Sequence, residues 1–143
     1  MGDTKQVLDA ATAAFNAHDE QRLRAFYGDD SVLEAPGDVR LQGVDSIIGY
    51  VMAWLNAFPD AQLTVHNEVI SGEWAVQQFT FEGTHEDTLS GPGGDIPATQ
   101  KRLKGRGADV FHLVEGKIAE EYLYFDQVQV LTQLGLMPEP ATA

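Results

Sequence analysis

Alternating apolar and polar residues near the C-terminal end predict a β-hairpin, and this hairpin limits the possible folds more than any other feature. The two alternating runs are 103–114 and 118–125, and the turn between them contains Gly116. Glycine at the fourth position of a type I turn predicts a three-residue loop with a bulge. In that register Leu113 pairs with Lys117, which fixes the pairing of every residue that follows.

The predicted register gives the two faces of the hairpin different characters. The apolar face consists of Phe111, Leu113, Ala119, Leu123 and Phe125. The aromatic and titratable face consists of Arg106, Ala108, Val110, His112, Ile118, Glu120, Tyr122, Tyr124 and Asp126. A two-residue turn would instead separate His112 from Asp126 across the sheet. The pattern alone leaves open whether the titratable face lines a pocket or meets solvent or a partner subunit.

Helical periodicity in the first half and strand alternation in the second predict an α+β fold in one domain, residues 1–143. Helices are expected at 3–15, from Asp19 through Leu23, Phe26 and Tyr27, at 44–58 and, as a last turn, at 128–134. Further strands are expected at 31–35, 62–71 and 74–84, with a loop at 85–100. A sheet that curves around a helix would leave a pocket between the two as the natural site.

Composition narrows the possible partners. The chain has 9 Lys and Arg against 22 Asp and Glu, a formal net charge of -13, which disfavours nucleic acid and anionic membranes and suits a neutral ligand. The absence of cysteine excludes disulfides and thiolate chemistry. The N-terminal segment lacks a signal-peptide pattern, no apolar run approaches a membrane span, and Gln6 breaks a myristoylation motif, so a cytoplasmic location is expected.

Four segments carry a resemblance to a known family. They are FPD at 58–60, FEGTH at 81–85, ATQKRLKGRG at 98–107 and VEGKIAEEYLYFD at 114–126, the last followed by QLG. With them the chain resembles the SnoaL-like polyketide cyclases of the NTF2-like, ketosteroid isomerase-like superfamily over nearly its whole length. The resemblance implies a cone-shaped barrel with N-terminal helices packed against a strongly curved, mostly antiparallel sheet. It also implies a homodimer or homotetramer built on the outer sheet surface.

The same resemblance implies a cofactor-free aldol ring closure on a hydrophobic aromatic polyketide ester. Asp126 takes the position of the general acid/base, and His112, fourteen residues earlier (126 minus 112), takes that of its companion. One carboxyl can remove a proton next to a carbonyl and later protonate the new alkoxide. Substrate-binding roles are expected for His85, Tyr122, Tyr124, Trp54 and Arg106. No metal is expected, because His85, Glu86 and Asp87 lack the spacing of a metal site.

Other functions on the same fold remain open, because a fold does not determine a reaction. One alternative is a non-catalytic domain that binds a small ligand or forms oligomers; others are an isomerase, a hydroxylase or an epoxide hydrolase. The isomerases place an aspartate before the proline where this chain has Ala35, and Glu34 should point to the other face of the strand. An epoxide hydrolase needs an Asp-Arg-Asp set, of which Arg106 and Asp126 supply only part.

Overall fold

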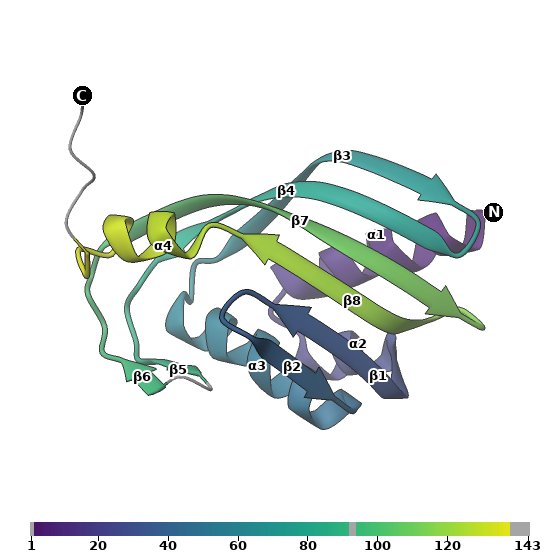
Figure 1. Ribbon diagram of the computed structural model, residues 1–143, viewed down its shortest axis with the longest axis horizontal. Coiled ribbons are helices and arrows are strands. Elements are labelled where there is room, and N and C mark those ends of the chain that lie inside the picture. The colour runs from purple at the N-terminus through teal and green to yellow at the C-terminus, as the bar shows by residue number, and fades with distance from the viewer. Residues whose placement is uncertain (1, 92–93, 138–143) are drawn as a thin grey trace.

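A curved sheet with helices on its concave side organises the protein (Figure 1). The computed structural model describes residues 2–91 and 94–137. The helices are α1 (Gly2–Asn16), α2 (Glu20–Ala25), α3 (Val44–Ala57) and α4 (Gln127–Gln133). The strands are β1 (Tyr27–Ala35), β2 (Val39–Gln42), β3 (Gln62–Ser71), β4 (Trp74–Thr84), β5 (Leu89–Gly91), β6 (Gly94–Ile96), β7 (Arg102–Val114) and β8 (Lys117–Phe125).

The main sheet has six strands in the order β2-β1-β8-β7-β4-β3. Its neighbouring strands run antiparallel except β1 and β8, which run parallel. Strands β5 and β6 form a separate two-stranded sheet. The predicted NTF2-like α+β architecture is therefore confirmed, with the correction that the sheet is open: β2 and β3 are its two edges and do not pair with each other across the described residues.

Amphipathic helices fill the concave side of this sheet. Helix α1 packs against β3, and α3 packs against β1 and β5 (Figure 1). Buried residues of α3, including Ile47, Ile48 and Leu55, recur at helical spacing and join Leu8 of α1 in one hydrophobic core. Asp19 caps α2 as predicted, its carboxylate accepting a hydrogen bond from the backbone N–H of Arg22 at 3.1 Å.

Three short or irregular segments differ from the sequence-based prediction. Tyr27 was expected in the second helix but begins β1, where it pairs with Ile118, because α2 already ends at Ala25. Strand β2 and the β5–β6 pair were not predicted. These strands have three or four residues each, too few for an alternating pattern to be recognised.

The turn of the β7–β8 hairpin also differs from the prediction, but a bulge in β8 partly cancels the resulting shift in strand register. The loop has two residues, Glu115 and Gly116, both with positive φ (52° and 77°), as in a type I′ turn. This pairs Leu113 with Ile118. The next pair is His112 with Glu120, so Ala119 is an extra residue in β8.

The two-residue turn alone would pair odd-numbered residues of β7 with even-numbered residues of β8. The bulge adds one residue and so restores pairing of odd with odd and even with even. Beyond it, Asp109 pairs with Leu123 and Gly107 with Phe125, so odd-numbered residues of both strands share one face. That shared face is the concave one, which carries the buried Phe111 and Asp109. Among the described residues, no helix is both long and apolar enough to cross a membrane.

Gly107 is predicted to be required for the packing of β7 against its neighbours. A Cβ there would lie 2.7 Å from Cζ of Phe79 and 2.8 Å from the backbone oxygen of Tyr124. We expect Gly107→Ala to lower the free energy of unfolding by about 1–3 kcal/mol, because the backbone oxygen cannot move aside easily. Urea unfolding would measure this change.

Gly49→Ala is the matched control for that experiment. Gly49 is exposed in the interior of α3 and has open space where a Cβ would lie. Alanine favours a helix interior by about 1 kcal/mol over glycine, so this variant should be slightly stabilised. Equal stability of Gly107→Ala and wild type would show that β7 can adjust and would contradict the prediction.

Candidate functional site

A cavity of about 140 Å³ lies between the helices and the concave face of the sheet. Its walls are mostly apolar and come from α1, α3, β4, β7 and β8. A volume of this size accommodates about one aromatic ring. The exposed members of its lining are Arg106 and Asp126, so we place its mouth beside them, where β8 ends and α4 begins.

Two buried carboxyl groups face this cavity from adjacent strands. Asp109 of β7 is 9% exposed and Glu121 of β8 is 6% exposed, and both line the cavity. Their positions are diagonal neighbours across the strand pair, because Asp109 lies opposite Leu123. The two side chains are hydrogen-bonded to each other, and the buried hydroxyl of Tyr27 donates to Oε1 of Glu121 at 2.5 Å. The result is a compact Asp109–Glu121–Tyr27 cluster.

Burial decides the protonation of this cluster. It raises the pKa of Asp109 well above the usual range, and the neighbouring Glu121 charge raises it further. Burial also raises the pKa of Glu121, although the hydrogen bonds from Asp109 and Tyr27 oppose this effect. Because burial raises the pKa of both carboxyls, the pair favours a state in which the two groups share one proton. Oδ1 of Asp109 has no hydrogen-bond partner among the described residues, which leaves it available to a ligand.

Polar groups on neighbouring elements extend the cluster. Gln77 of β4 lies opposite Asp109 and is 3% exposed; its amide donates to Oε2 of Glu68 at 2.7 Å. Tyr50 of α3 also lines the cavity, and burial raises its pKa, so its hydroxyl stays protonated. Tyr50 can therefore donate a hydrogen bond to a bound molecule.

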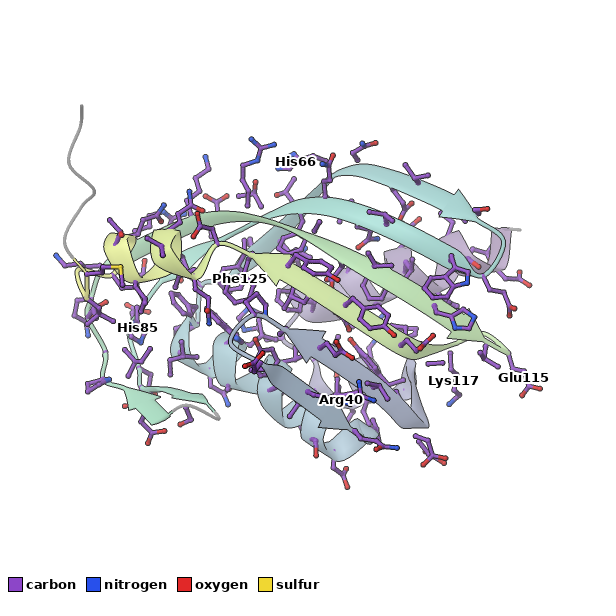
Figure 2. All side chains as sticks on the ribbon, viewed as in Figure 1. Arg40, His66, His85, Glu115, Lys117 and Phe125 are labelled. Atoms are coloured by element: carbon purple, nitrogen blue, oxygen red, sulfur yellow. The ribbon has the colours of Figure 1, made fainter. Side chains whose placement is uncertain are left out.

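Three of the residues predicted for the site line the cavity. Trp54 packs one face of its indole on Phe58 at 5.9 Å and meets Phe125 edge to face at 5.7 Å; Figure 2 labels Phe125. Arg106 and Asp126 lie at the mouth. Asp126 is exposed and caps α4, because Oδ1 accepts a hydrogen bond from the backbone N–H of Gln129 at 3.1 Å.

Most of the titratable hairpin face does not line the cavity, because the even-numbered residues of β7, and those of β8 after the bulge, point to the convex side of the sheet. His112 stacks on Trp74 with ring centroids 4.3 Å apart, and its Nδ1 lies 2.8 Å from Glu120. Tyr122 also donates to Glu120, at 2.9 Å, and Tyr124 is 59% exposed. The expected proximity of these residues to a pocket is therefore corrected.

His112 and Asp126 are also far apart along the hairpin. His112 pairs with Glu120, whereas Asp126 follows the Gly107–Phe125 pair. Six residues of strand separate the two positions, which corresponds to about 20 Å. The structure therefore does not bring these two predicted groups together, and their catalytic roles stay predictions.

His85 was expected at the rim of the pocket but is buried outside its lining. Its ring stacks on Phe58 at 5.1 Å, and Nδ1 accepts from the backbone N–H of Thr99 at 3.3 Å, so the ring proton lies on Nε2. Burial lowers the pKa of His85. Its backbone bonds with Gln100 and Lys101, both shorter than 3.0 Å, hold the ends of the 85–101 segment together. His85 is thus a packing residue in this structure.

Comparison with known proteins shows which family this sheet and cavity belong to. The family model described as SnoaL-like polyketide cyclase matches residues 5–134. The chain belongs to the SnoaL-like polyketide cyclase family. A search of curated proteins gave no match.

Solved structures share the fold of this SnoaL-like protein at low sequence identity. AclR, a hydroxylase candidate from Streptomyces galilaeus, is 22% identical with a TM-score of 0.81, over 97% of this chain and 89% of that one. IdmH, a polyketide cyclase candidate from Streptomyces antibioticus, is 23% identical with a TM-score of 0.76, over 92% and 98%. An LEH-like epoxide hydrolase from M. tuberculosis is 19% identical with a TM-score of 0.72, over 94% and 90%. Their different descriptions mean that the reaction must be argued from the site of this SnoaL-like protein.

The sequence analysis missed Asp109, Glu121 and Tyr27, although a signal for two of them was present. Asp109 and Glu121 are odd-numbered, like the apolar residues of the hairpin. Each is therefore a carboxyl group on an otherwise apolar face. A carboxyl at such a position must be buried, paired or at an interface. Tyr27 gave no comparable signal, because it was placed in a helix.

The cluster can exchange protons with a bound molecule. A carboxyl pair that shares one proton offers an acid and a base side by side, in a cavity with mostly apolar walls. Within residues 2–91 and 94–137, no group of three or more His, Cys, Asp or Glu side chains is arranged to hold a metal ion.

The raised pKa of Asp109 predicts a specific pH dependence of stability. A carboxyl whose pKa is raised on folding stabilises the folded state below its ordinary pKa, and this contribution is lost as the pH rises through its folded pKa. Asp109→Asn keeps a donor to Glu121 but cannot ionise. The free energy of unfolding of wild type minus that of the variant should therefore fall as the pH rises from about 4, by up to about 1.4 kcal/mol per pH unit.

Urea unfolding at a series of pH values measures this difference. Asp30→Asn, at an exposed aspartate of β1, is the control, and its difference from wild type should stay nearly constant. A constant difference for Asp109→Asn as well would mean that the carboxyl ionises without penalty and is solvated in the folded protein.

Proposed function

We propose that this protein is a cofactor-independent, cyclase-like enzyme that closes a ring by intramolecular aldol condensation on a hydrophobic aromatic substrate. The observation that carries the proposal is the buried Asp109–Glu121 pair facing an apolar cavity. Membership of the SnoaL-like family supports the reaction class. The cavity volume suits one ring of the substrate, with the remainder extending past the mouth.

The proposed mechanism moves one proton in each direction. The pair, which holds one proton, accepts a second from the carbon next to a substrate carbonyl and generates an enolate. The enolate carbon attacks a second carbonyl of the same molecule and forms the new carbon–carbon bond. The pair then returns a proton to the resulting alkoxide, so no atom is lost and the enzyme is restored.

Hydrogen-bond donors in the lining would stabilise the charged oxygen during these steps. Tyr50 is the donor best placed for this role, because it is protonated, lines the cavity and is not bonded to the carboxyl pair. Tyr27 instead donates to Glu121 and holds that carboxylate in position. Asp126, the sequence-based choice for the acid/base, would act at the mouth as a polar contact for the substrate.

Proton exchange on a small ketone tests the buried pair directly. We expect wild type to accelerate exchange of the α-protons of β-tetralone in D₂O, followed by NMR. Asp109→Asn and Glu121→Gln should each lower the rate by about 100-fold or more, because each removes one half of the proton-transfer pair. Conversion of an aromatic polyketide methyl ester to a product of unchanged mass would then test ring closure.

Glu120→Gln is the matched control, since Glu120 is the same residue type one position away and points to the convex face. It should keep the wild-type exchange rate. If Asp126→Asn abolishes exchange while Asp109→Asn does not, the acid/base is Asp126, as the sequence predicts. If wild type binds the ketone without exchanging its protons, the protein is a ligand-binding domain and the proposal fails.

A second copy of the chain is the proposed partner of the convex sheet face. Val69 (60% exposed) and Val76 (39% exposed) pair across β3 and β4, and this apolar row continues through Val110 to Tyr122. A continuous apolar row of this kind is typical of an interface. An isologous dimer would cover both copies of the row at once.

Sedimentation would test this assembly. We expect wild type to form a dimer that strengthens with added salt, because each chain carries a formal charge of -13. Val76→Glu should shift the protein to monomer. The same substitution at Val128, an exposed valine on α4, should leave the dimer intact. A wild-type monomer at all salt concentrations would refute the assembly.

A further inference from the structure

Gln77 of β4 is a buried amide in the cavity wall that the proposed mechanism does not use. It is 3% exposed and lines the cavity. In the pairing of β4 with β7 it lies directly opposite Asp109. Residues opposite each other in antiparallel strands have Cβ atoms about 4.5–5.5 Å apart. The Gln77 amide is therefore a direct neighbour of the buried carboxyl pair.

Glu68 of β3 determines which way this amide points. A glutamine side chain presents two N–H donors on one side and a carbonyl acceptor on the other, and it can rotate to exchange them. Nε2 of Gln77 donates to Oε2 of Glu68 at 2.7 Å. A carboxylate offers acceptors only, so the opposite orientation would bring two acceptors together. Nε2 of Gln77 therefore faces Glu68, and Oε1 lies on the other side of the amide.

Lys5 of α1 bonds the second oxygen of Glu68. Nζ of this exposed lysine lies 3.2 Å from Oε1 of Glu68. An ammonium group has three donors and no acceptor, so it is the natural partner of a charged carboxylate. Each oxygen of Glu68 thus has its own donor. The chain of bonds from the surface of α1 to the cavity wall has a single arrangement of donors and acceptors.

Oε1 of Gln77 is open to a bound molecule. Within the described residues, the hydrogen bond of the Gln77 side chain uses Nε2, and Oε1 accepts none. Because Gln77 lines the cavity and Oε1 is not one of the fully covered atoms without a partner, this oxygen is reached from the cavity. A carbonyl oxygen in a mostly apolar wall is unfavourable unless a donor reaches it. The wall therefore favours a ligand that carries a donor at this point.

This requirement distinguishes ligands of the same size by their chemistry. A hydroxyl group can donate to the Gln77 oxygen, whereas an ether or carbonyl oxygen would place two acceptors side by side. A site built around a hydrogen bond rejects an analogue that lacks the bonding group more strongly than a site built on size alone. The wall position beside Asp109 is therefore suited to selecting a hydroxyl.

We propose that Gln77 determines substrate specificity, with its Oε1, oriented by Glu68, accepting a hydrogen bond from a hydroxyl group on the substrate ring. This inference rests on the proposed function and narrows its substrate class to a hydroxylated ring, a phenol or an enol. The O–H of that ring points toward β4, and the methyl ether of the same ring is disfavoured. Glu68 is a positioning residue, because it acts on the ligand only through Gln77.

Binding of two isomers tests this inference without requiring turnover. The isomers para-cresol and anisole have the same atoms, and each fits a cavity that holds about one ring. In titrations followed by amide NMR, we expect wild type to bind para-cresol about tenfold more tightly than anisole, because anisole leaves the Gln77 oxygen unpaired. Gln77→Met removes the acceptor and keeps a side chain of similar length, so the ratio of the two affinities should fall to about one.

Glu68→Gln tests the orienting bond without altering the cavity wall. The amide introduced there can donate as well as accept, so Gln77 can turn its Nε2 into the cavity. Anisole binding should then tighten relative to wild type. Binding of para-cresol should change little, since a phenol hydroxyl both donates and accepts. Lys5→Gln is the matched control: it removes the cation but leaves the Glu68 carboxylate, so the wild-type ratio should remain.

The outcomes separate this inference from the proposed function. Equal affinities of wild type for the two isomers overturn the inference, even if β-tetralone exchange is fast. A ratio that Gln77→Met leaves unchanged overturns the assignment to Gln77. A ratio that Lys5→Gln lowers as much as Glu68→Gln does overturns the orienting role of Glu68. A ratio that falls in Gln77→Met and Glu68→Gln but not in Lys5→Gln supports the inference, even if wild type shows no exchange and the proposed cyclase activity fails.

Discussion

One extra residue, Ala119, decides which side chains of the closing hairpin face the cavity. The two-residue turn alone would give Asp109 and Glu121 opposite faces, and the bulge reverses that effect. Because of it, two carboxyls meet on the concave face beside the cavity while His112 and Glu120 meet on the convex face. The chemistry of the interior and the composition of the outer surface therefore both depend on one local irregularity in β8.

Burying two carboxyl groups opposes folding unless the charge is reduced and the remaining polar atoms are bonded. Sharing one proton removes one of the two charges, and the Tyr27 hydroxyl bonds the other. The unbonded Oδ1 of Asp109 is the part of this cost that the described residues do not offset. A group that remains unsatisfied at a cavity wall is expected where a ligand supplies the missing hydrogen bond. The cost in folding stability and the capacity for proton transfer thus both result from burying the carboxyl pair.

The sequence was sufficient for the architecture and for part of the site. Periodicity placed α1, α3 and the long strands, and the family segments identified the curved sheet, because long patterned elements carry strong signals. Trp54, Arg106 and Asp126, which the sequence analysis named for the site, line the cavity, and their roles stay predictions. The role of His112 could not be judged, because its environment depends on which face of the sheet the helices cover. That choice is made by the packing of α1 and α3 against the apolar face of the hairpin, which carries Phe111 and Phe125.

The same packing explains why an acid/base at Asp126 and one at Asp109 are physically different hypotheses. Asp126 is exposed, and one of its oxygens already accepts a hydrogen bond from the backbone of α4, so this carboxyl lies in solvent and serves as a helix cap. Burial raises the pKa of both Asp109 and Glu121, and in the proposed mechanism this pair supplies the base. An enolate forms only when a base competes with water for a weakly acidic proton, and competition of that kind favours the dry pair over the solvated carboxylate. Asp126 has a different contribution to the site: by capping α4 it holds the helix against β7 and keeps the mouth beside Arg106 in place.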